Sequence, residues 1–299
     1  MVPTSWWTAA DSSASVQVRG TMKPSTDVVK TDLSGHVGII RLVDERRRNA
    51  LSAAMREGFV SAFYDMMGDP DVRAIYLTGY GQTFCAGGDL RMMRDESDPW
   101  SSHQRLNRTA RWLTDFLRCP KPVVVGVNGV AVGGGIGIAV IGDVILAAEN
   151  AARFQAGFMR LGLLPDIGVM YTLPRLVGLA RAKTFLFENG SWTAREAETA
   201  GLVTAVVPDD ELEARGLERA AALAAGPVEA YGLAKRIMGA SYETSLDEMM
   251  QHEDLGQCLA YSTEAMREGL TALTEKRRPD FVTASEREPA VKNSRERDT

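Results

Sequence analysis

The stretch Lys121–Asp143, KPVVVGVNGVAVGGGIGIAVIGD, decides the fold of this chain. Within residues 123–142 only Asn128 is polar, and seven of the twenty residues are glycine. About twenty apolar residues can cross a bilayer, but a glycine in a helix interior costs roughly 1 kcal/mol relative to alanine. The β-branched block Val123–Val127 ends at a turn that begins with Asn128, and a glycine turn at Gly133 opens a buried helix. The stretch therefore predicts a strand, a turn and a helix rather than a membrane span.

The glycine turn itself indicates a binding function. Consecutive glycines let a backbone approach a ligand closely, because no Cβ atom is in the way. A helix that starts there presents unpaired N–H groups and suits negative charge. A dinucleotide motif would need Gly or Ala at Ile138 or Val140, and the phosphate-loop motif is absent. We interpret the turn as suited to a developing oxyanion rather than to a pyrophosphate.

Composition bounds the class of protein. The chain has 299 residues, of which 45% are hydrophobic and 24% charged, and its net charge is −5. These values are ordinary for a globular protein and give no reason to expect nucleic-acid binding. Cys85, Cys119 and Cys258 lack the spacing of metal ligands, and the three histidines are far apart in the sequence. We therefore expect reduced thiols, no metal site, no secretory signal peptide and a cytoplasmic location.

Strands and helices alternate through residues 31–207, and a helical pattern follows through residues 208–282. This order predicts an α/β core with a helical C-terminal region. The Ser/Thr-rich residues 1–30 are expected to form a disordered extension, and residues 283–299 a mobile charged tail. The polar section Asp95–Asn107 is also expected to be mobile.

A second glycine turn resembles the first. The segment Phe84–Leu90, FCAGGDL, follows the predicted strand Ala74–Thr78 and precedes a helix. Two such turns could direct two backbone N–H groups at one oxygen, which is the geometry of an oxyanion hole. The alternative is that both are only tight corners between strands and helices.

One carboxyl group lies in an aliphatic loop. Asp166 is flanked by Leu163, Leu164, Pro165 and Ile167, which would desolvate it and raise its pKa toward a range useful for catalysis. Asp166 could equally be a turn residue or the N-cap of a helix.

Six segments together resemble the crotonase superfamily, the enoyl-CoA hydratase/isomerase family. They are RNALS (48–52), FCAGGDL (84–90), the central stretch 121–143, LGLLPDIG (161–168), LPRLVGLARA (173–182) and TAREAETAGLV (193–203). The two glycine motifs in this order are highly specific, and the resemblance runs from about Gly35 to Phe281.

The resemblance implies a ββα spiral core and C-terminal helices used in trimerisation, often in a hexamer of two trimers. It implies an acyl-CoA thioester substrate whose carbonyl oxygen accepts hydrogen bonds from the N–H groups of Gly88 and Gly134. Coenzyme A would enter as part of the substrate, with no separate cofactor, and no nucleic acid or membrane would be a partner. The residues implied to contact the CoA moiety or the acyl group are Arg46, Arg48, Ala50, Ala86, Asp89, Leu90 and Phe158. On the residues alone, Arg46-Arg47-Arg48 is either a solvated loop or a phosphate clamp.

The sequence departs from the hydratase pattern at the catalytic positions. Hydratases of this family carry Glu where this chain has Gly137, and their second Glu aligns with Phe158. Hydration needs one group to activate water and another to protonate carbon. Asp166 remains, in the P-D-x-G position where the isomerase branch, including ring-1,2-epoxyphenylacetyl-CoA isomerases, carries its base. The resemblance therefore implies double-bond isomerisation of an enoyl-CoA with Asp166 as catalytic base.

Three alternatives stay open. The chain could hydrate an enoyl-CoA with unusual residues. It could resemble 4-chlorobenzoyl-CoA dehalogenase, in which an Asp at the same position is the nucleophile, although the active-site Trp of that enzyme aligns with Phe158. It could also be a non-catalytic acyl-CoA binder that keeps the fold, since both Glu residues are missing.

Overall fold

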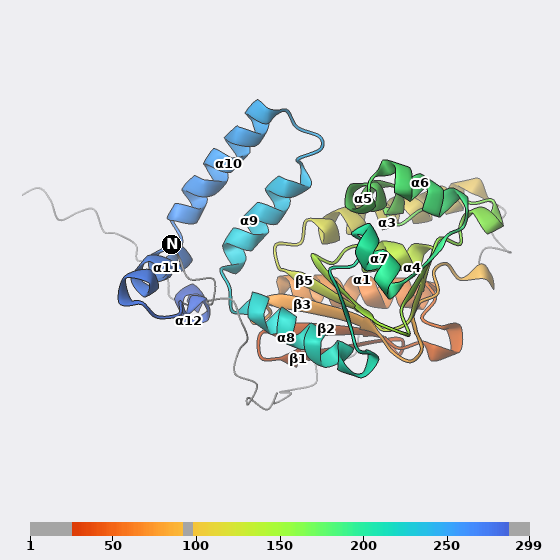
Figure 1. The fold of residues 1–299 in the computed structure, drawn as a ribbon, viewed down its shortest axis with the longest axis horizontal. Coiled ribbons are helices and arrows are strands. Elements are labelled where there is room, and N and C mark those ends of the chain that lie inside the picture. Colours follow the sequence, from red (N-terminus) through yellow and green to blue (C-terminus); the bar gives the residue numbers. More distant parts are fainter. Residues whose placement is uncertain (1–25, 92–97, 287–299) are drawn as a thin grey trace, which may run out of the picture.

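The computed structural model describes residues 26–91 and 98–286. Two sheets form the core (Figure 1), a six-stranded sheet of order β1-β2-β3-β5-β7-β10 and a four-stranded sheet of order β4-β6-β8-β9. The strands are β1 (Val29–Ser34), β2 (Val37–Leu42), β3 (Ala74–Gly79), β4 (Thr83–Cys85), β5 (Val123–Val127), β6 (Val130–Val132), β7 (Val144–Ala148), β8 (Arg153–Gln155), β9 (Ser191–Thr193) and β10 (Ala205–Val207).

The chain passes repeatedly from one sheet to the other. Each of the pairs β3 and β4, β5 and β6, and β7 and β8 places its first strand in the large sheet and its second in the small one. Within each sheet the strands contributed by the three pairs, β3-β5-β7 and β4-β6-β8, run parallel to one another, and a helix follows each pair. This repetition produces the ββα spiral core that the sequence predicted.

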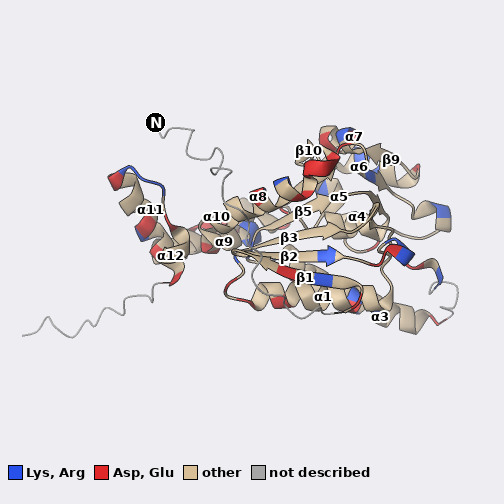
Figure 2. Ribbon diagram, turned by 90° about the horizontal axis from the view of Figure 1, so that it is seen from below, with Lys and Arg blue, Asp and Glu red and all other residues tan. Residues whose placement is uncertain are grey.

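Helices cover both faces of the large sheet. A Cβ atom on Gly38 of β2 would overlap Met66 of α1 (Ala53–Gly68), whereas a Cβ atom on Gly216 of α8 (Leu212–Ala224) would overlap the ring of Tyr76. Gly38 pairs with Ile75, and Tyr76 is the next residue along the same strand. Because successive side chains of a strand point to opposite faces, α1 and α8 lie on opposite faces. The charged residues coloured in Figure 2 lie mainly on helices and loops, and β3 and β5 contain none.

An aromatic cluster joins α1 to α3 (Pro99–Leu117). Phe63 of α1 stacks on Phe116 of α3 with ring centroids 3.8 Å apart, and Phe59 meets Trp112 edge-on at 6.0 Å. Aromatic pairs in these geometries add roughly 0.5–1.5 kcal/mol each beyond the area that they bury. The side chain of Asp98 caps α3 by accepting the N–H groups of Trp100 and Ser101.

The helix α3 corrects one expectation from the sequence. Residues 99–107, which were expected to be mobile, form its first turns, because an Asp cap followed by Pro at the first helical position starts a helix well. Residues 95–97 of that section lie outside the described residues.

The remaining helices connect the sheets and form the C-terminal region. They are α4 (Gly134–Ala139), α5 (Val169–Val177), α6 (Leu179–Phe187), α7 (Ala194–Ala200), α9 (Val228–Gly239), α10 (Leu246–Tyr261), α11 (Glu264–Glu275) and α12 (Phe281–Glu286), with short 3₁₀ turns at η2 (Glu45–Arg47), η3 (Met159–Leu161) and η4 (Asp209–Glu211). Helices α9 to α12 extend from one side of the core (Figure 1). The buried Arg73 attaches them, donating to the carbonyl oxygens of Ala224 at 2.7 Å and Gly226 at 2.9 Å and to the hydroxyl of Ser285 at 2.6 Å.

The ordered elements extend slightly beyond the bounds expected at both ends. The strand β1 begins at Val29, and α12 runs to Glu286. Residues 26–28 are also described, and the remainder of the expected disordered extension (1–25) and of the mobile tail (287–299) lies outside the described residues. The division into a core over 31–207 and a helical region over 208–282 stays a prediction, and α8 packs on β3 and β5 of the core.

Candidate active site

The two glycine turns lie side by side. The strands β4 and β6 that lead into them are parallel neighbours, with Cys85 paired to Ala131. A Cβ atom on Gly135 would overlap the carbonyl oxygen of Cys85, and one on Gly87 would overlap the carbonyl oxygen of Val132. Only glycine permits both approaches. The interpretation of the turns as nothing more than separate corners therefore misses their direct contact.

The backbone at this junction can donate hydrogen bonds. Gly134 is the first residue of α4, so its N–H group has no acceptor within the helix. A Cβ atom on Gly87 would lie 3.4 Å from the nitrogen of Gly134, which places the segment leading into Gly88 beside the start of α4. Backbone N–H groups held in this way can stabilise a developing oxyanion.

The segment that carries the arginines runs along the second glycine motif. Leu51 forms a parallel bridge with Gly88, and its N–H group donates to the carbonyl oxygen of Gly87 at 2.7 Å. The N–H group of Ala86 donates to the carbonyl oxygen of Arg48 at 3.1 Å. The structure thus brings together two segments, 46–51 and 86–90, that the sequence had linked only through the resemblance.

The side chains in these two segments differ in exposure. Arg46, Arg48 and Leu90 are exposed, Ala50 is buried, and Ala86 and Asp89 are half-buried, with the Asp89 carboxylate accepting the N–H group of Arg91 at 3.1 Å. Buried Asn49 holds the first segment in place. Its side-chain amide donates to the carbonyl oxygens of Tyr80 at 3.1 Å and Thr83 at 2.7 Å.

The loop that carries Asp166 lies directly on α4. A Cβ atom on Gly134 would lie 2.8 Å from Cδ1 of Ile167, and one on Gly137 would lie 2.8 Å from Cβ of Ile167 and overlap its carbonyl oxygen. Because the missing side chain of Gly137 is what makes room for this loop, the position has no space for a glutamate. The half-buried Asp166 therefore lies one residue from the side chain that touches the first turn of α4.

The environment of Asp166 favours a carboxyl group that can exchange protons. Burial raises the pKa of Asp166, and the positive charges of Arg105 and Arg56 act in the opposite direction. Arg105 lies on the inner stripe of α3 that continues through Thr109, Trp112 and Phe116. Desolvation against nearby opposite charge is a combination found at catalytic carboxylates.

Phe158 lies at the other side of the first glycine turn. It is buried, and its Cζ atom would lie 3.5 Å from a Cβ atom placed on Gly133. An aromatic ring therefore borders this glycine turn, at the position that the resemblance aligns with the second glutamate of the hydratases.

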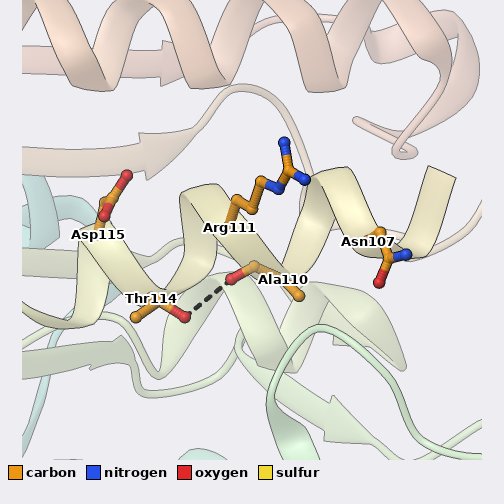
Figure 3. Close-up of a pocket in the computed structure, with 5 residues that line it drawn as sticks. All are labelled: Asn107, Ala110, Arg111, Thr114 and Asp115. Carbon is orange, nitrogen blue, oxygen red and sulfur yellow. Dashed lines mark hydrogen bonds between the residues drawn. The ribbon is translucent and has the colours of Figure 1, made fainter. Parts of the chain in front are cut away.

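A surface depression on α3 is separate from these residues. Figure 3 shows its lining, which comes from α3 alone, with the Thr114 hydroxyl donating to the carbonyl oxygen of Ala110 at 2.8 Å; the lining residues are Asn107, Ala110, Arg111, Thr114 and Asp115. Across residues 26–91 and 98–286, no three metal-ligating side chains gather, and no helix has the length and apolarity needed to span a bilayer.

The contacts of three side chains at the site, those of Ile167, Arg105 and Arg56, were not recognised from the sequence. The contact of Ile167 with Gly134 and Gly137 joins segments about thirty residues apart, and no local pattern signals it. Arg105 could have been found, since its helical spacing to Thr109 and Trp112 puts it on the buried stripe, but its segment was expected to be mobile. Arg56 donates to the carbonyl oxygen of Leu51 at 2.6 Å within its own helical start.

The spiral of two mostly parallel sheets, with two glycine turns meeting at the ends of neighbouring strands, defines a crotonase-type fold. A crystal structure described as an enoyl-CoA hydratase/isomerase from Cupriavidus metallidurans aligns with a TM-score of 0.81 and 33% identity, covering 86% of this chain and 97% of that one. An enoyl-CoA hydratase subunit from Geobacillus kaustophilus aligns with a TM-score of 0.80 and 33% identity, covering 86% and 98%.

Comparisons of sequence agree. Residues 32–284 match the model of the enoyl-CoA hydratase/isomerase family, and the chain belongs to that family. A probable enoyl-CoA hydratase of Rhodobacter capsulatus is 35% identical over 269 residues, which cover 86% of this chain and 99% of the relative. The 1,2-epoxyphenylacetyl-CoA isomerase of Escherichia coli is 33% identical over 253 residues, which cover 82% and 95%.

Proposed function

We propose that this protein isomerises the double bond of an enoyl-CoA thioester, with Asp166 as the base and the N–H groups of Gly88 and Gly134 as the oxyanion hole. The observation that carries the proposal is the packing of the Asp166 loop against α4. It brings a half-buried carboxyl group of raised pKa close to Gly134 and fills the space that a glutamate at Gly137 would need.

One base suffices for this reaction. The Asp166 carboxylate removes a proton from a carbon of the acyl chain that is acidified by conjugation with the thioester, and the electron pair moves into the carbonyl group. The resulting enolate oxygen accepts hydrogen bonds from Gly88 and Gly134, each worth roughly 2.7–4 kcal/mol in a transition state of this kind. The protonated Asp166 then returns the proton to another carbon, so that no atom is gained or lost.

The CoA moiety is assigned to the paired segments 46–51 and 86–90. Exposed Arg46 and Arg48 are available to its phosphates, and Ala50, Ala86, Asp89 and Leu90 to its remaining parts, while Phe158 would border the acyl group. We expect no cofactor beyond the coenzyme A of the substrate. We also expect the protein to be cytoplasmic.

Proton exchange with solvent tests the proposal directly. Incubation of the protein in D₂O with a panel of 3-enoyl- and 2-enoyl-CoA thioesters is expected to shift the double bond and to place deuterium at the α or γ carbon, because the abstracted proton can exchange while it is held on Asp166. Mass spectrometry and NMR of the recovered thioesters detect both changes. Tight binding without deuterium incorporation would instead indicate a non-catalytic acyl-CoA binder.

Hydration is the second candidate, because several relatives, including the one from Rhodobacter capsulatus, are named as probable enoyl-CoA hydratases. Addition of water to crotonyl-CoA removes its conjugated absorbance and adds the mass of water to the product. Hydration faster than isomerisation across the panel would overturn the proposal. Release of chloride from a chlorobenzoyl-CoA would do so in favour of dehalogenation.

We expect a homotrimer or a dimer of trimers. Among the described residues, α9 has no buried side chain and α10 buries only Gly256, while Met238, Leu246 and Leu255 are 65%, 74% and 64% exposed. Exposed apolar side chains on helices that bury so little surface favour an interface with another chain. Light scattering is expected to give three or six times the 32.5 kDa chain mass, and Leu255→Glu to lower it. A monomer at micromolar concentration would contradict this expectation.

A further inference from the structure

We propose that Ile167 is a positioning residue for the reaction, a hydrophobic wedge that sets the place of Asp166 relative to the oxyanion hole. The inference rests on the proposed function, because it concerns the geometry of the same base. Ile167 is half-buried and follows Asp166 directly, so any movement of its backbone moves the carboxyl group.

The wedge contacts α4 at two successive positions of one helix face. Its Cδ1 atom reaches Gly134, and its Cβ and Cγ2 atoms and its carbonyl oxygen reach Gly137. Positions three apart lie on the same face of a helix. The side chain and backbone of Ile167 therefore fill space beside α4 that is free only because both positions are glycine.

The backbone of Ile167 is held in an unfavourable conformation. Its φ angle is +48°, in the left-handed region that a β-branched residue rarely adopts. Such outliers persist only where the surrounding structure imposes them, and they cluster at functional sites. A glycine at this position would relieve the strain, so the presence of isoleucine in this chain points to a use for its side chain.

Contacts on the other side keep the loop in place. Gly168, with φ +71°, lies under α3, where its Cβ atom would come 2.7 Å from Cδ2 of Leu113. The carbonyl oxygen of Asp166 accepts the N–H group of Val169 at 3.1 Å, which joins the loop to the start of α5. The loop is thus clamped between α3 and α4, and Ile167 is the part of it that reaches the start of α4.

Substitutions at Ile167 test this role. Ile167→Gly removes the wedge and relieves the backbone, and Ile167→Val keeps the branched Cβ against Gly137 while losing only the Cδ1 methyl group. Lys276→Gly is the matched control, because Lys276 is exposed at the end of α11 with φ +55° and lies far along the chain from the site. Each variant is assayed as the full chain for kcat and KM, deuterium incorporation and thermal midpoint.

The glycine variant is expected to fold and to lose about 100-fold in kcat, since small misplacements of a catalytic group have costs of this order. Its KM for the thioester is expected to stay within about threefold of wild type, because ground-state binding through the CoA segments is untouched. Ile167→Val is expected to stay within about fivefold in kcat, and Lys276→Gly to match wild type. A loss of folded protein would also lower the apparent kcat at constant KM, so kcat is calculated per folded protein, whose fraction at the assay temperature comes from the thermal unfolding curve.

Wild-type kcat and deuterium incorporation in folded Ile167→Gly would overturn the inference. Should the glycine variant fail to fold, Ile167→Ala takes its place, and wild-type kcat in that variant overturns the inference equally. These failures differ from a failure of the proposed function. Retained turnover in Asp166→Asn would refute the assignment of Asp166 as the base. An active Ile167→Gly variant beside an inactive Asp166→Asn variant would refute only the role of the wedge.

Discussion

Asp166→Asn is expected to lower kcat for double-bond migration by about 10³-fold, within the range that positioned acid–base groups contribute. The amide keeps the shape of the carboxylate but cannot take up and return a proton. Deuterium incorporation into recovered substrate is expected to fall by the same factor. The KM for the thioester is expected to change little, because the CoA segments 46–51 and 86–90 stay intact.

The substitution should leave the protein folded. Burial disfavours the charged form of Asp166, so a neutral amide at this position relieves desolvation rather than adding to it. Asp115→Asn is the matched control: it changes an exposed carboxyl group on α3, bonded to the Tyr64 hydroxyl at 2.6 Å, and should keep full activity. Near-wild-type turnover in folded Asp166→Asn would refute the assignment of the base.

The pH dependence of kcat gives the same assignment a second readout. A base acts in its deprotonated form, so activity rises as the pH passes its pKa. Because burial raises the pKa of Asp166, the rising limb of the pH profile is expected above the pH at which an ordinary aspartate ionises. The positive charges of Arg105 and Arg56 reduce this upward shift of the pKa. The residual activity of Asp166→Asn should lack this limb.

Gly137→Glu, which restores the glutamate of the hydratase pattern, is expected to create no hydratase. The new Cβ atom would lie 2.8 Å from Cβ of Ile167 and would overlap the Ile167 carbonyl oxygen, a backbone atom that cannot rotate away. Overpacking of a core typically costs roughly 1–3 kcal/mol. We expect a lower thermal midpoint, because the core is overpacked. We also expect isomerase activity below about a tenth of wild type, because the overlap displaces the loop that carries Asp166, and a misplacement of about 1 Å can lower the rate by about 100-fold.

Gly137→Ala separates the steric effect from the chemical one. It adds the same Cβ atom without a carboxylate, so it should lose thermal stability and isomerase activity much as the glutamate variant does. Hydration of crotonyl-CoA by Gly137→Glu but not by Gly137→Ala would show that the position accommodates a working glutamate. The packing argument for this loop would then be wrong.

Local patterns predicted much of the fold. The β-branched blocks at Val123–Val127 and Ala74–Thr78 form β5 and β3, and Ser52 caps α1 by accepting the N–H group of Met55. The spacing of Thr193 and Glu196 predicts a capping box, and the structure has it at the start of α7. These elements were predictable because their determinants, apolar runs and cap residues, lie within a few residues of one another.

Other elements were missed where tertiary contacts decide. The short strand β6 and the edge strand β1 carry weak local signals and are stabilised by pairing with β4, β8 and β2. The sequence pattern over residues 173–187 predicts one continuous helix, but these residues belong to two helices, because Gly178 adopts φ +82° between α5 and α6. The absence of a glutamate at Gly137 was visible in the sequence, but its steric reason was not.

The sequence by itself determined the alternation of strands and helices, the two glycine turns and the aspartate in an aliphatic loop, since each depends on residue type and near-neighbour spacing. The spiral core and the family followed from the resemblance that these motifs carry. Only the tertiary structure decided how these parts meet. The contact of Cys85 with Gly135, and of Ile167 with Gly134 and Gly137, depends on parallel strands and a loop brought together from distant segments. At such contacts a missing Cβ atom allows a close approach, and only the folded chain shows what approaches.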